Sequence, residues 1–219
     1  MDSLRRLEEL FAHFPGIGPR QAKRFVYYLL NKPPASVKEL AQLIEEVKKS
    51  TSECEKCHRF FTHRNIKALV CSICSDANRD QSTLMVVARD SDFESIEKSG
   101  AYKGLYFVLG GTVAILDKEP EKRIRLKSLL ERVSEAASKV ITGKNSNNGA
   151  PLKEIILSLN TTPDGEHTAN IVKEGLESLL HTKALSFGKV TLLGRGLSTG
   201  AELEYVDGET IKSALQNRH

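Results

Sequence analysis

The sequence predicts an α/β protein in which two small modules precede a domain built on a mostly parallel sheet. Near the N-terminus, two helical patterns flank a turn rich in glycine and proline, and four cysteines then fall within residues 54–74. From Thr83 onward, short apolar runs alternate with amphipathic helical patterns, which is typical of strands joined by helices. The expected domains are residues 1–50, 51–78, 79–194 and 195–219.

The first module is predicted to be a helix-hairpin-helix. Asp2 or Ser3 can cap a first helix, and Gly16 and Gly18 suit a tight turn after it. Pro19 suits the first position of a second helix, because its missing N–H costs nothing there. The apolar positions of that helix are Ala22, Phe25, Val26, Leu29 and Leu30.

A third helix is expected to begin at Ser36, where Ser36 and Glu39 form a capping-box pattern. Its apolar positions follow helical spacing and are expected to be buried. They are Val37, Leu40, Ala41, Ile44 and Val47.

The turn at Gly16 and Gly18 is a candidate DNA-binding site. Glycines let the backbone approach a phosphate, and free N–H groups at the start of a helix can bind it. Arg20, Lys23 and Arg24 add positive charge, and residues 1–75 carry a net charge of +5 against −1 for the remainder. Such contacts favour sequence-independent binding of single- or double-stranded DNA that salt weakens. The alternatives are a packing turn between helices, or helices that associate subunits.

Cys54, Cys57, Cys71 and Cys74 form two Cys-x2-Cys pairs separated by thirteen residues. Two thiolate pairs at this spacing can close a tetrahedron around Zn²⁺, and a site with four protein ligands is structural. The alternative is a pair of redox motifs, but neither pair is expected to start a helix after a strand. His58 and His63 are expected at the surface and not as ligands, and Phe60 and Phe61 are expected to form the module's small core.

The main domain is expected to contain a first strand at 84–88 and later strands at 105–109, 155–159 and 190–193. Helices are expected from Asp92 and over 121–138, 166–180 and 208–215, the last one capped by Asp207. The 194–200 segment is rich in glycine but lacks a P-loop ending, so a flexible turn is expected.

Acidic residues follow two of these strands: Asp90 and Asp92 the first, and Asp164 and Glu166 the third. A Mg²⁺-dependent enzyme of the nuclease or primase type would need such carboxylates to converge. These four residues are weak evidence for a catalytic metal centre, because acidic residues at strand ends often cap helices, as Asp92 could. A nicking assay with Glu166→Ala as control separates this alternative from a protein that only binds.

Four stretches, in order along the chain, resemble the RecR family of recombination mediators. They are FPGIGPR at 14–20, YKGLYFVLGG at 102–111, NTTPDGEHTA at 160–169 and RGLSTGAELEY at 195–205. The resemblance implies a helix-hairpin-helix, a four-cysteine zinc module, a Toprim domain and a C-terminal oligomerisation segment. It also implies a non-enzymatic protein that forms a dimer or tetramer ring and works with RecO-like and RecF-like proteins to load RecA on single-stranded DNA.

The same resemblance implies that Arg20, Lys23 and Arg24 face DNA and that Asp92 and Glu166 lie where a RecO-like protein docks. This chain departs from the family pattern at Ala88, which stands where a glutamate usually follows the first strand. It also has a longer segment between its cysteine pairs and an apparent insertion at 144–149.

The expected location is the cytoplasm. No apolar stretch approaches the ~18 residues of a membrane span, and charged residues interrupt the N-terminal segment where a signal peptide would be apolar. Cysteines clustered for a metal also fit a reducing compartment.

Overall fold

The computed structural model describes residues 2–62, 69–141, 152–183, 188–194, 196–197, 200 and 202–216. The chain divides into two compact units, residues 1–52 with 62–66, and residues 53–61 with 67–219. No helix within the described ranges combines the length and the apolar character that crossing a membrane requires.

The first unit holds α1 (Ser3–Ala12), α2 (Pro19–Leu30) and α3 (Pro34–Ser50). The Asp2 carboxylate accepts the Leu4 N–H at 3.2 Å, which confirms Asp2 as the cap of α1. Helices α1 and α2 pack through Phe11 and Phe25, whose rings meet edge to face at 5.9 Å.

Helix α3 departs from the prediction at its start and along its apolar stripe. It begins at Pro34 after Pro33, so Ser36 lies inside the helix and the expected capping box is wrong. None of its residues is buried, and Leu40, Ile44 and Val47 are 45%, 63% and 59% exposed. Helical spacing indicates that a face will be covered, but it does not say by which chain.

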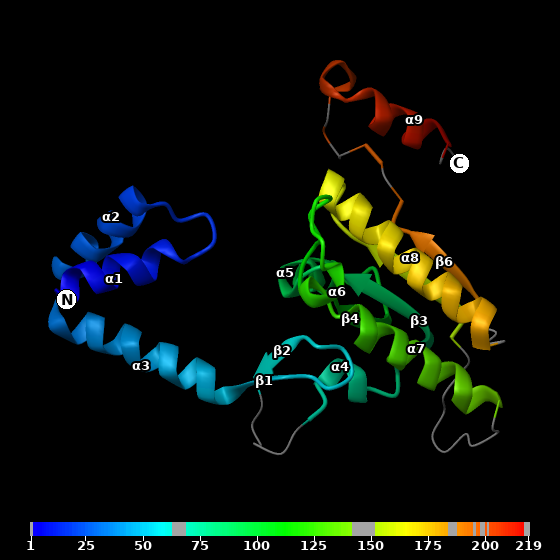
Figure 1. The fold of residues 1–219 in the computed structure, drawn as a ribbon, viewed down its shortest axis with the longest axis horizontal. Coiled ribbons are helices and arrows are strands. Elements are labelled where there is room, and N and C mark those ends of the chain that lie inside the picture. The colour runs from blue at the N-terminus through cyan, green and yellow to red at the C-terminus, as the bar shows by residue number, and fades with distance from the viewer. Residues whose placement is uncertain are drawn as a thin grey trace. The chain divides into compact units, whose positions relative to one another are not determined.

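The second unit is built on a parallel sheet of four strands in the order β4-β3-β5-β6 (Figure 1). The strands are β3 (Asp80–Val87), β4 (Gly104–Val108), β5 (Glu154–Ser158) and β6 (Lys189–Leu192). Central strand β3 pairs Val86 with Phe107 on one side and with Leu157 on the other. The mostly parallel α/β sheet that the sequence predicts is confirmed.

Both faces of the sheet are covered. One face packs its apolar side chains against α7 (Leu126–Ile141) and α8 (Pro163–Lys183), through residues such as Leu129 and Leu176. On the other face, Phe93 from α5 (Asp90–Ser99) packs with Tyr106 of β4, their rings 4.8 Å apart. A two-sided core of this kind explains why the strand sequences are continuously apolar.

The helix expected over 121–138 is broken into α6 (Pro120–Arg123) and α7. Ile124 between them is extended (φ −129°, ψ 156°) and its side chain is buried in the core. The N–H of Arg125 donates to the Leu109 carbonyl at 2.9 Å, so a tertiary contact takes the place of a helical hydrogen bond. A continuous amphipathic pattern does not reveal such a break.

The remaining elements are β1 (Thr51–Glu53), which pairs with β2 (Phe60–Thr62), then α4 (Ser72–Ser75), the 3-10 turn η1 (Leu203–Tyr205) and α9 (Gly208–Gln216). The carboxylate of Asp207 accepts the Thr210 N–H at 2.9 Å, which confirms it as the cap of α9. Helix α5 begins two residues before Asp92. The Asp92 carboxylate lies in its first turn and accepts the Arg89 N–H at 2.9 Å.

Candidate functional site

The turn between α1 and α2 is tight and open to solvent. Gly16 has a φ of +77°, a left-handed conformation that costs other residues roughly 1–2 kcal/mol. A Cβ added at Gly16 or at Gly18 would meet nothing within 4 Å. The glycines therefore serve the turn and leave the backbone approachable from outside.

Three backbone N–H groups in and next to this turn have no partner among the residues that the structure describes. The N–H groups of Ile17, Gln21 and Ala22 donate to carbonyls of the turn. Those of Gly16, Gly18 and Arg20 donate to none within the described ranges. These free donors lie in the turn and at the start of α2, where free N–H groups can bind phosphate.

Cationic side chains lie on the exposed face of α2. Arg20, Lys23 and Arg24 are all exposed, whereas Ala22 and Val26 on the other face are buried. Arg24 is 3.4 Å from the Gln21 amide oxygen, and Lys23 lies 5.9 Å from the ring centre of Tyr27. Leu30 was expected on the apolar face and is 63% exposed, since it lies at the end of α2.

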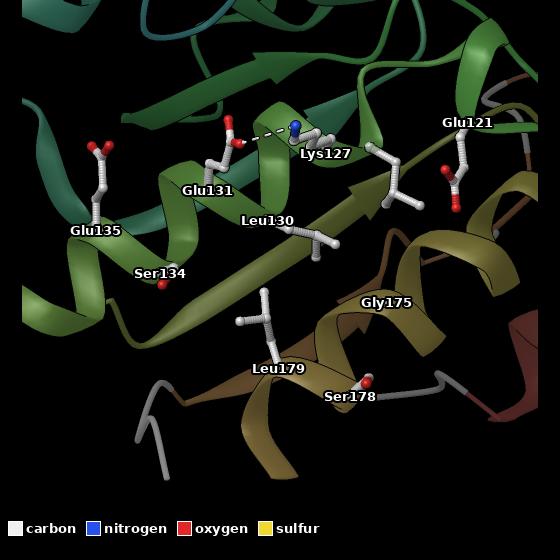
Figure 2. A pocket seen from close by; sticks show the side chains of 10 residues that line it. Glu121, Lys127, Leu130, Glu131, Ser134, Glu135, Gly175, Ser178 and Leu179 are labelled. Atoms are coloured by element: carbon white, nitrogen blue, oxygen red, sulfur yellow. Dashed lines mark ion pairs between the residues drawn. The ribbon is translucent and has the colours of Figure 1, made fainter. Parts of the chain in front are cut away.

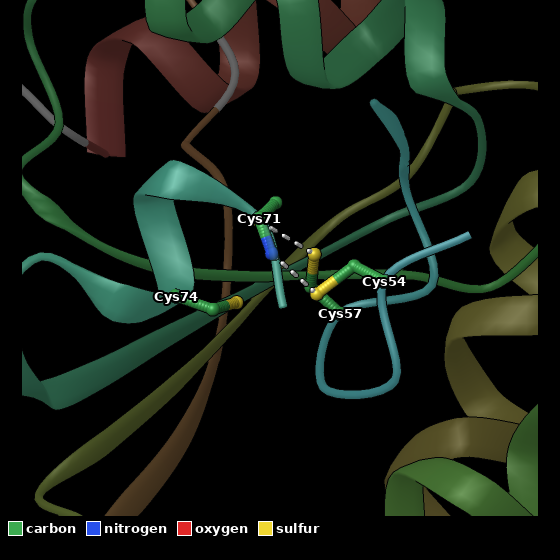
Figure 3. Close-up of side chains that lie close together, drawn as sticks. All are labelled: Cys54, Cys57, Cys71 and Cys74. Atoms are coloured by element: carbon green, nitrogen blue, oxygen red, sulfur yellow. Dashed lines mark hydrogen bonds between the residues drawn. The ribbon is translucent and has the colours of Figure 1, made fainter. Parts of the chain in front are cut away.

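The four cysteines converge on one point (Figure 3). Their sulfur atoms all lie within 4.8 Å of one another, and all four residues are buried and free of disulfides. The Cys57 and Cys71 sulfurs are 3.6 Å apart, close to the about 3.8 Å that a tetrahedron with metal–sulfur bonds of about 2.3 Å requires. This donor set fits a tetrahedral metal ion.

Hydrogen bonds and charge also suit thiolate ligands. The Cys71 N–H donates to the Cys54 sulfur at 3.3 Å. Hydrogen bonds from the other sulfurs lower the pKa of Cys54, and the largest effect comes from Cys57. The same hydrogen bond raises the pKa of Cys57. The pKa of Cys74 is raised, chiefly by Cys54, and the positive charge of Arg132 opposes this rise. A divalent cation in place of shared protons would let all four sulfurs ionise.

The first cysteine pair is bound to the outer edge of the sheet. Strand β4 is an edge strand, and its Val108 N–H donates to the Cys57 carbonyl at 2.8 Å. Arg132 of α7 donates to the carbonyls of Lys56 and Tyr106 at 2.6 Å and 2.8 Å. Residues 54–57, here called the cysteine knuckle, thereby bind polar groups that an edge strand would otherwise leave without a hydrogen-bond partner.

Further contacts hold the same segment in place. The Phe60 N–H donates to the Asp90 carboxylate at 2.9 Å, and the Arg125 guanidinium lies 3.3 Å from the Glu53 carboxylate. The guanidinium of Arg59 lies 4.7 Å from the ring centre of Phe93. Sequence analysis missed these partners, because they are far apart in the chain and no motif links them.

Other predictions about this module have mixed outcomes. Phe61 packs against the cysteines as expected, but Phe60 is 56% exposed. His58 is partly buried: its Nδ1 lies 2.6 Å from the Glu53 carboxylate, and its ring lies 5.2 Å from that of Phe107. Cys71 is the N-cap of α4, so the second pair stands at the start of a short helix, and no strand lies in the described residues 69–71 before it.

The acidic residues after β3 and β5 do not converge. Within the described ranges, the cysteines are the one group of three or more potential ligands whose atoms come together. Asp90 and Asp92 are engaged by the N–H groups of Phe60 and Arg89, and Asp164 accepts the Ile115 N–H at 3.4 Å. Glu166 lines a cavity of about 220 Å³ beside Asn160 and Thr161.

Ala88 directly follows β3 and is fully buried. Its carbonyl accepts the Gly110 N–H at 3.0 Å, so the segment after β3 is joined to the segment after β4. At this position, therefore, the chain offers a buried methyl group and no carboxylate.

A larger groove of about 660 Å³ lies between α7 and α8 (Figure 2). Leucines and Gly175 line its floor, and acidic side chains lie around it, one of which pairs with Lys127 at 4.0 Å. The lining residues are Glu121, Leu126, Lys127, Leu130, Glu131, Ser134, Glu135, Gly175, Ser178 and Leu179. None of the predicted DNA, metal or partner residues belongs to it.

Several predicted features fall outside the described residues. These are His63, the 144–149 segment and three residues of the 194–200 turn: Arg195, Ser198 and Thr199.

Comparison with known proteins agrees with this arrangement. Family models match residues 4–48 as the RecR helix-hairpin-helix, 82–185 as a Toprim domain and 196–219 as the RecR C-terminal region. The recombination protein RecR of Chloroflexus aggregans is 36% identical over 213 residues, which covers 97% of this chain and 91% of that protein. The RecR of Cereibacter sphaeroides is 36% identical (98% and 95% covered), and that of Lactobacillus helveticus is 34% identical (98% and 96%).

Proposed function

Because this chain belongs to the RecR family of recombination proteins, we propose that it is a DNA-binding mediator of recombinational repair that acts without catalysis. The observation that carries this proposal is the hairpin turn. The free N–H groups of Gly16, Gly18 and Arg20 and the exposed cations of α2 suit the sugar-phosphate backbone. No base-reading element is needed, so the protein binds single- and double-stranded DNA irrespective of sequence.

The test is the salt dependence of oligonucleotide binding, measured by fluorescence anisotropy with the wild type and with Arg20→Ala. We expect Arg20→Ala to weaken binding uniformly across unrelated sequences, because a phosphate contact carries no base information. The slope of log affinity against log salt should fall by about 1 for the lost contact.

The matched control is Arg123→Ala, which removes an equal charge from an exposed arginine paired with Asp117. It should leave DNA binding unchanged. If Arg20→Ala and Arg123→Ala bind DNA with equal affinity, or if the wild type does not bind DNA at low salt, the proposal fails.

The occupant of the four-cysteine site is proposed to be Zn²⁺ in a structural role. Cys54, Cys57, Cys71 and Cys74 would hold it. When bound, zinc supplies a crosslink that a segment with so little core cannot supply by itself. The support is the fit of the donor set, since soft thiolates in a tetrahedron select zinc over hard cations.

The partners are proposed to be RecO-like and RecF-like proteins, with which the chain would help load RecA on single-stranded DNA. Asp92 and Glu166 are the proposed docking residues for the RecO-like partner. Both lie just after adjacent parallel strands, β3 and β5, and therefore at the same end of the sheet. Ala88 lies at that end too and contributes no charge, so docking would depend on the acids that remain.

The assembly is proposed to be a homo-oligomeric ring, a dimer or tetramer, located in the cytoplasm with the chromosome. Support comes from α3, whose apolar stripe is exposed on the single chain. A second copy of the chain is the proposed occupant of this stripe, since exposed apolar stripes mark surfaces of association.

A further inference from the structure

Arg132 occupies an unusual place between the sheet and the metal site. It lies on α7 between Leu129 and Val133, which are both buried in the core. Its guanidinium reaches the edge of β4 and donates there to the carbonyls of Tyr106 and Lys56, at 2.8 Å and 2.6 Å. It also lies 5.9 Å from the ring centre of Phe107.

Lys56 is the residue whose carbonyl places Arg132 at the metal site. It stands inside the first Cys-x2-Cys pair, between Cys54 and Cys57, which are both fully buried. The side chain of Arg132 therefore joins the backbone of the cysteine knuckle to the backbone of the sheet. The next outward-facing group of β4, the Val108 N–H, binds Cys57 directly.

The positive charge of Arg132 beside the four cysteines has a second consequence. Four thiolates around a divalent ion leave a net charge of −2 in a buried place, and low dielectric makes that charge costly without a cation nearby. The nearby Glu53 carboxylate forms an ion pair with Arg125 at 3.3 Å, so its charge is already compensated. Arg132 brings a permanently charged group with several donors to the ligand knuckle itself.

We propose that Arg132 is a positioning residue of the metal site: it holds the first cysteine knuckle against β4 and offsets the negative charge of the four thiolates, and so sets how tightly the module retains its metal. This inference rests on the proposed binding of zinc by the four cysteines. Outer-shell partners of metal ligands change metal affinity by about 10–100-fold when removed. An effect of that size is expected for Arg132.

The test is zinc affinity of the full chain, measured by competition with a chromophoric chelator. Arg132→Gln removes the charge and should raise the zinc dissociation constant about tenfold or more. The cysteine thiols of that variant should also react faster with a thiol reagent, because their thiolates are less protected. Arg123→Gln is the control, since it removes an equal charge from α6, where Arg123 pairs with Asp117.

A zinc dissociation constant of Arg132→Gln within twofold of the wild type would overturn the proposal. If Arg132→Gln does not fold, Arg132→Lys decides: it keeps the charge but loses the guanidinium fork, so zinc should leave it faster than the wild type. An unchanged release rate would then refute the positioning role. A wild type that holds no zinc would instead refute the proposed function of the cysteines, which is a distinguishable result.

Discussion

Tyr102 packs on the sheet face covered by α5, and its hydroxyl donates to the Leu105 carbonyl at 3.0 Å. Burial raises its pKa to about 12. An unfolded chain ionises tyrosine near pH 10, so above that pH ionisation favours the unfolded state. The contribution of Tyr102 to stability is therefore complete below about pH 10 and is lost as the pH rises toward 12.

Replacing Tyr102 by Phe should flatten this alkaline loss of stability. Between pH 9 and pH 11 the free energy of unfolding, measured in urea, should fall by up to about 1 kcal/mol more in the wild type than in Tyr102→Phe. Tyr205→Phe alters a tyrosine that is 81% exposed and should behave as the wild type. Parallel pH profiles for the wild type and Tyr102→Phe would contradict this explanation.

Side chains at the turn and the metal site were predictable one by one. Gly16 and Gly18 stand in a short glycine-proline segment, and the cysteines stand at metal-ligand spacing, so the local sequence identifies both. Arg132 and Glu53 were not predictable. An arginine beside an apolar helix stripe ordinarily faces water, and only the folded chain brings it to the Lys56 carbonyl.

At the scale of elements, β4 depends on the cysteine knuckle more than its sequence suggests. Its inward-facing groups bond to β3, whereas the outward Val108 N–H bonds to Cys57 and the outward Tyr106 carbonyl to Arg132. Binding of the proposed zinc ion would therefore be coupled to the edge of the sheet, because residues 54–57 are also the partner of that edge.

Metal removal should therefore loosen one edge of β4 selectively. After incubation with a chelator, the Val108 amide should exchange hydrogen at least about tenfold faster, because a broken contact worth about 1.4 kcal/mol changes the open population tenfold. The Leu109 amide donates to the Val87 carbonyl inside the sheet and serves as the internal control. Equal acceleration at both amides would indicate general unfolding, and no acceleration at Val108 would show that the coupling is absent.

Strand and helix identity was predictable, but two helix boundaries were not. The break at Ile124 follows from the bond between Arg125 and Leu109, which are distant partners. The early start of α3 at Pro34 follows from the preference of proline for the first turn, which outweighed the Ser36 pattern.

At the scale of the whole molecule, α3 is a helix whose apolar face stays exposed. Leu40, Ile44 and Val47 are exposed along one stripe, and water-exposed stripes of this kind mark surfaces of association. Placing a charge in the stripe should prevent that association, because a buried unpaired carboxylate costs several kcal/mol.

Ile44→Asp should therefore reduce the mass of the protein in solution to half or less, as measured by light scattering. Gln42→Asp is the matched control: it adds the same charge to the polar face of α3 and should leave the mass unchanged. Circular dichroism confirms that each variant is folded. If Ile44→Asp keeps the wild-type mass, α3 is not an interface.

The sequence by itself determined the order of modules, the parallel α/β class, the hairpin turn and the group of four cysteines. Each of these depends on short-range spacing, such as two glycines in a turn, two cysteines in a knuckle or an apolar run in a strand. The tertiary structure alone decided that the cysteine knuckle covers the edge of β4 and that Arg132 links the knuckle to this strand. It also decided that the apolar stripe of α3 is exposed. These features depend on contacts between residues distant in the chain, and local spacing carries no information about which distant groups will meet.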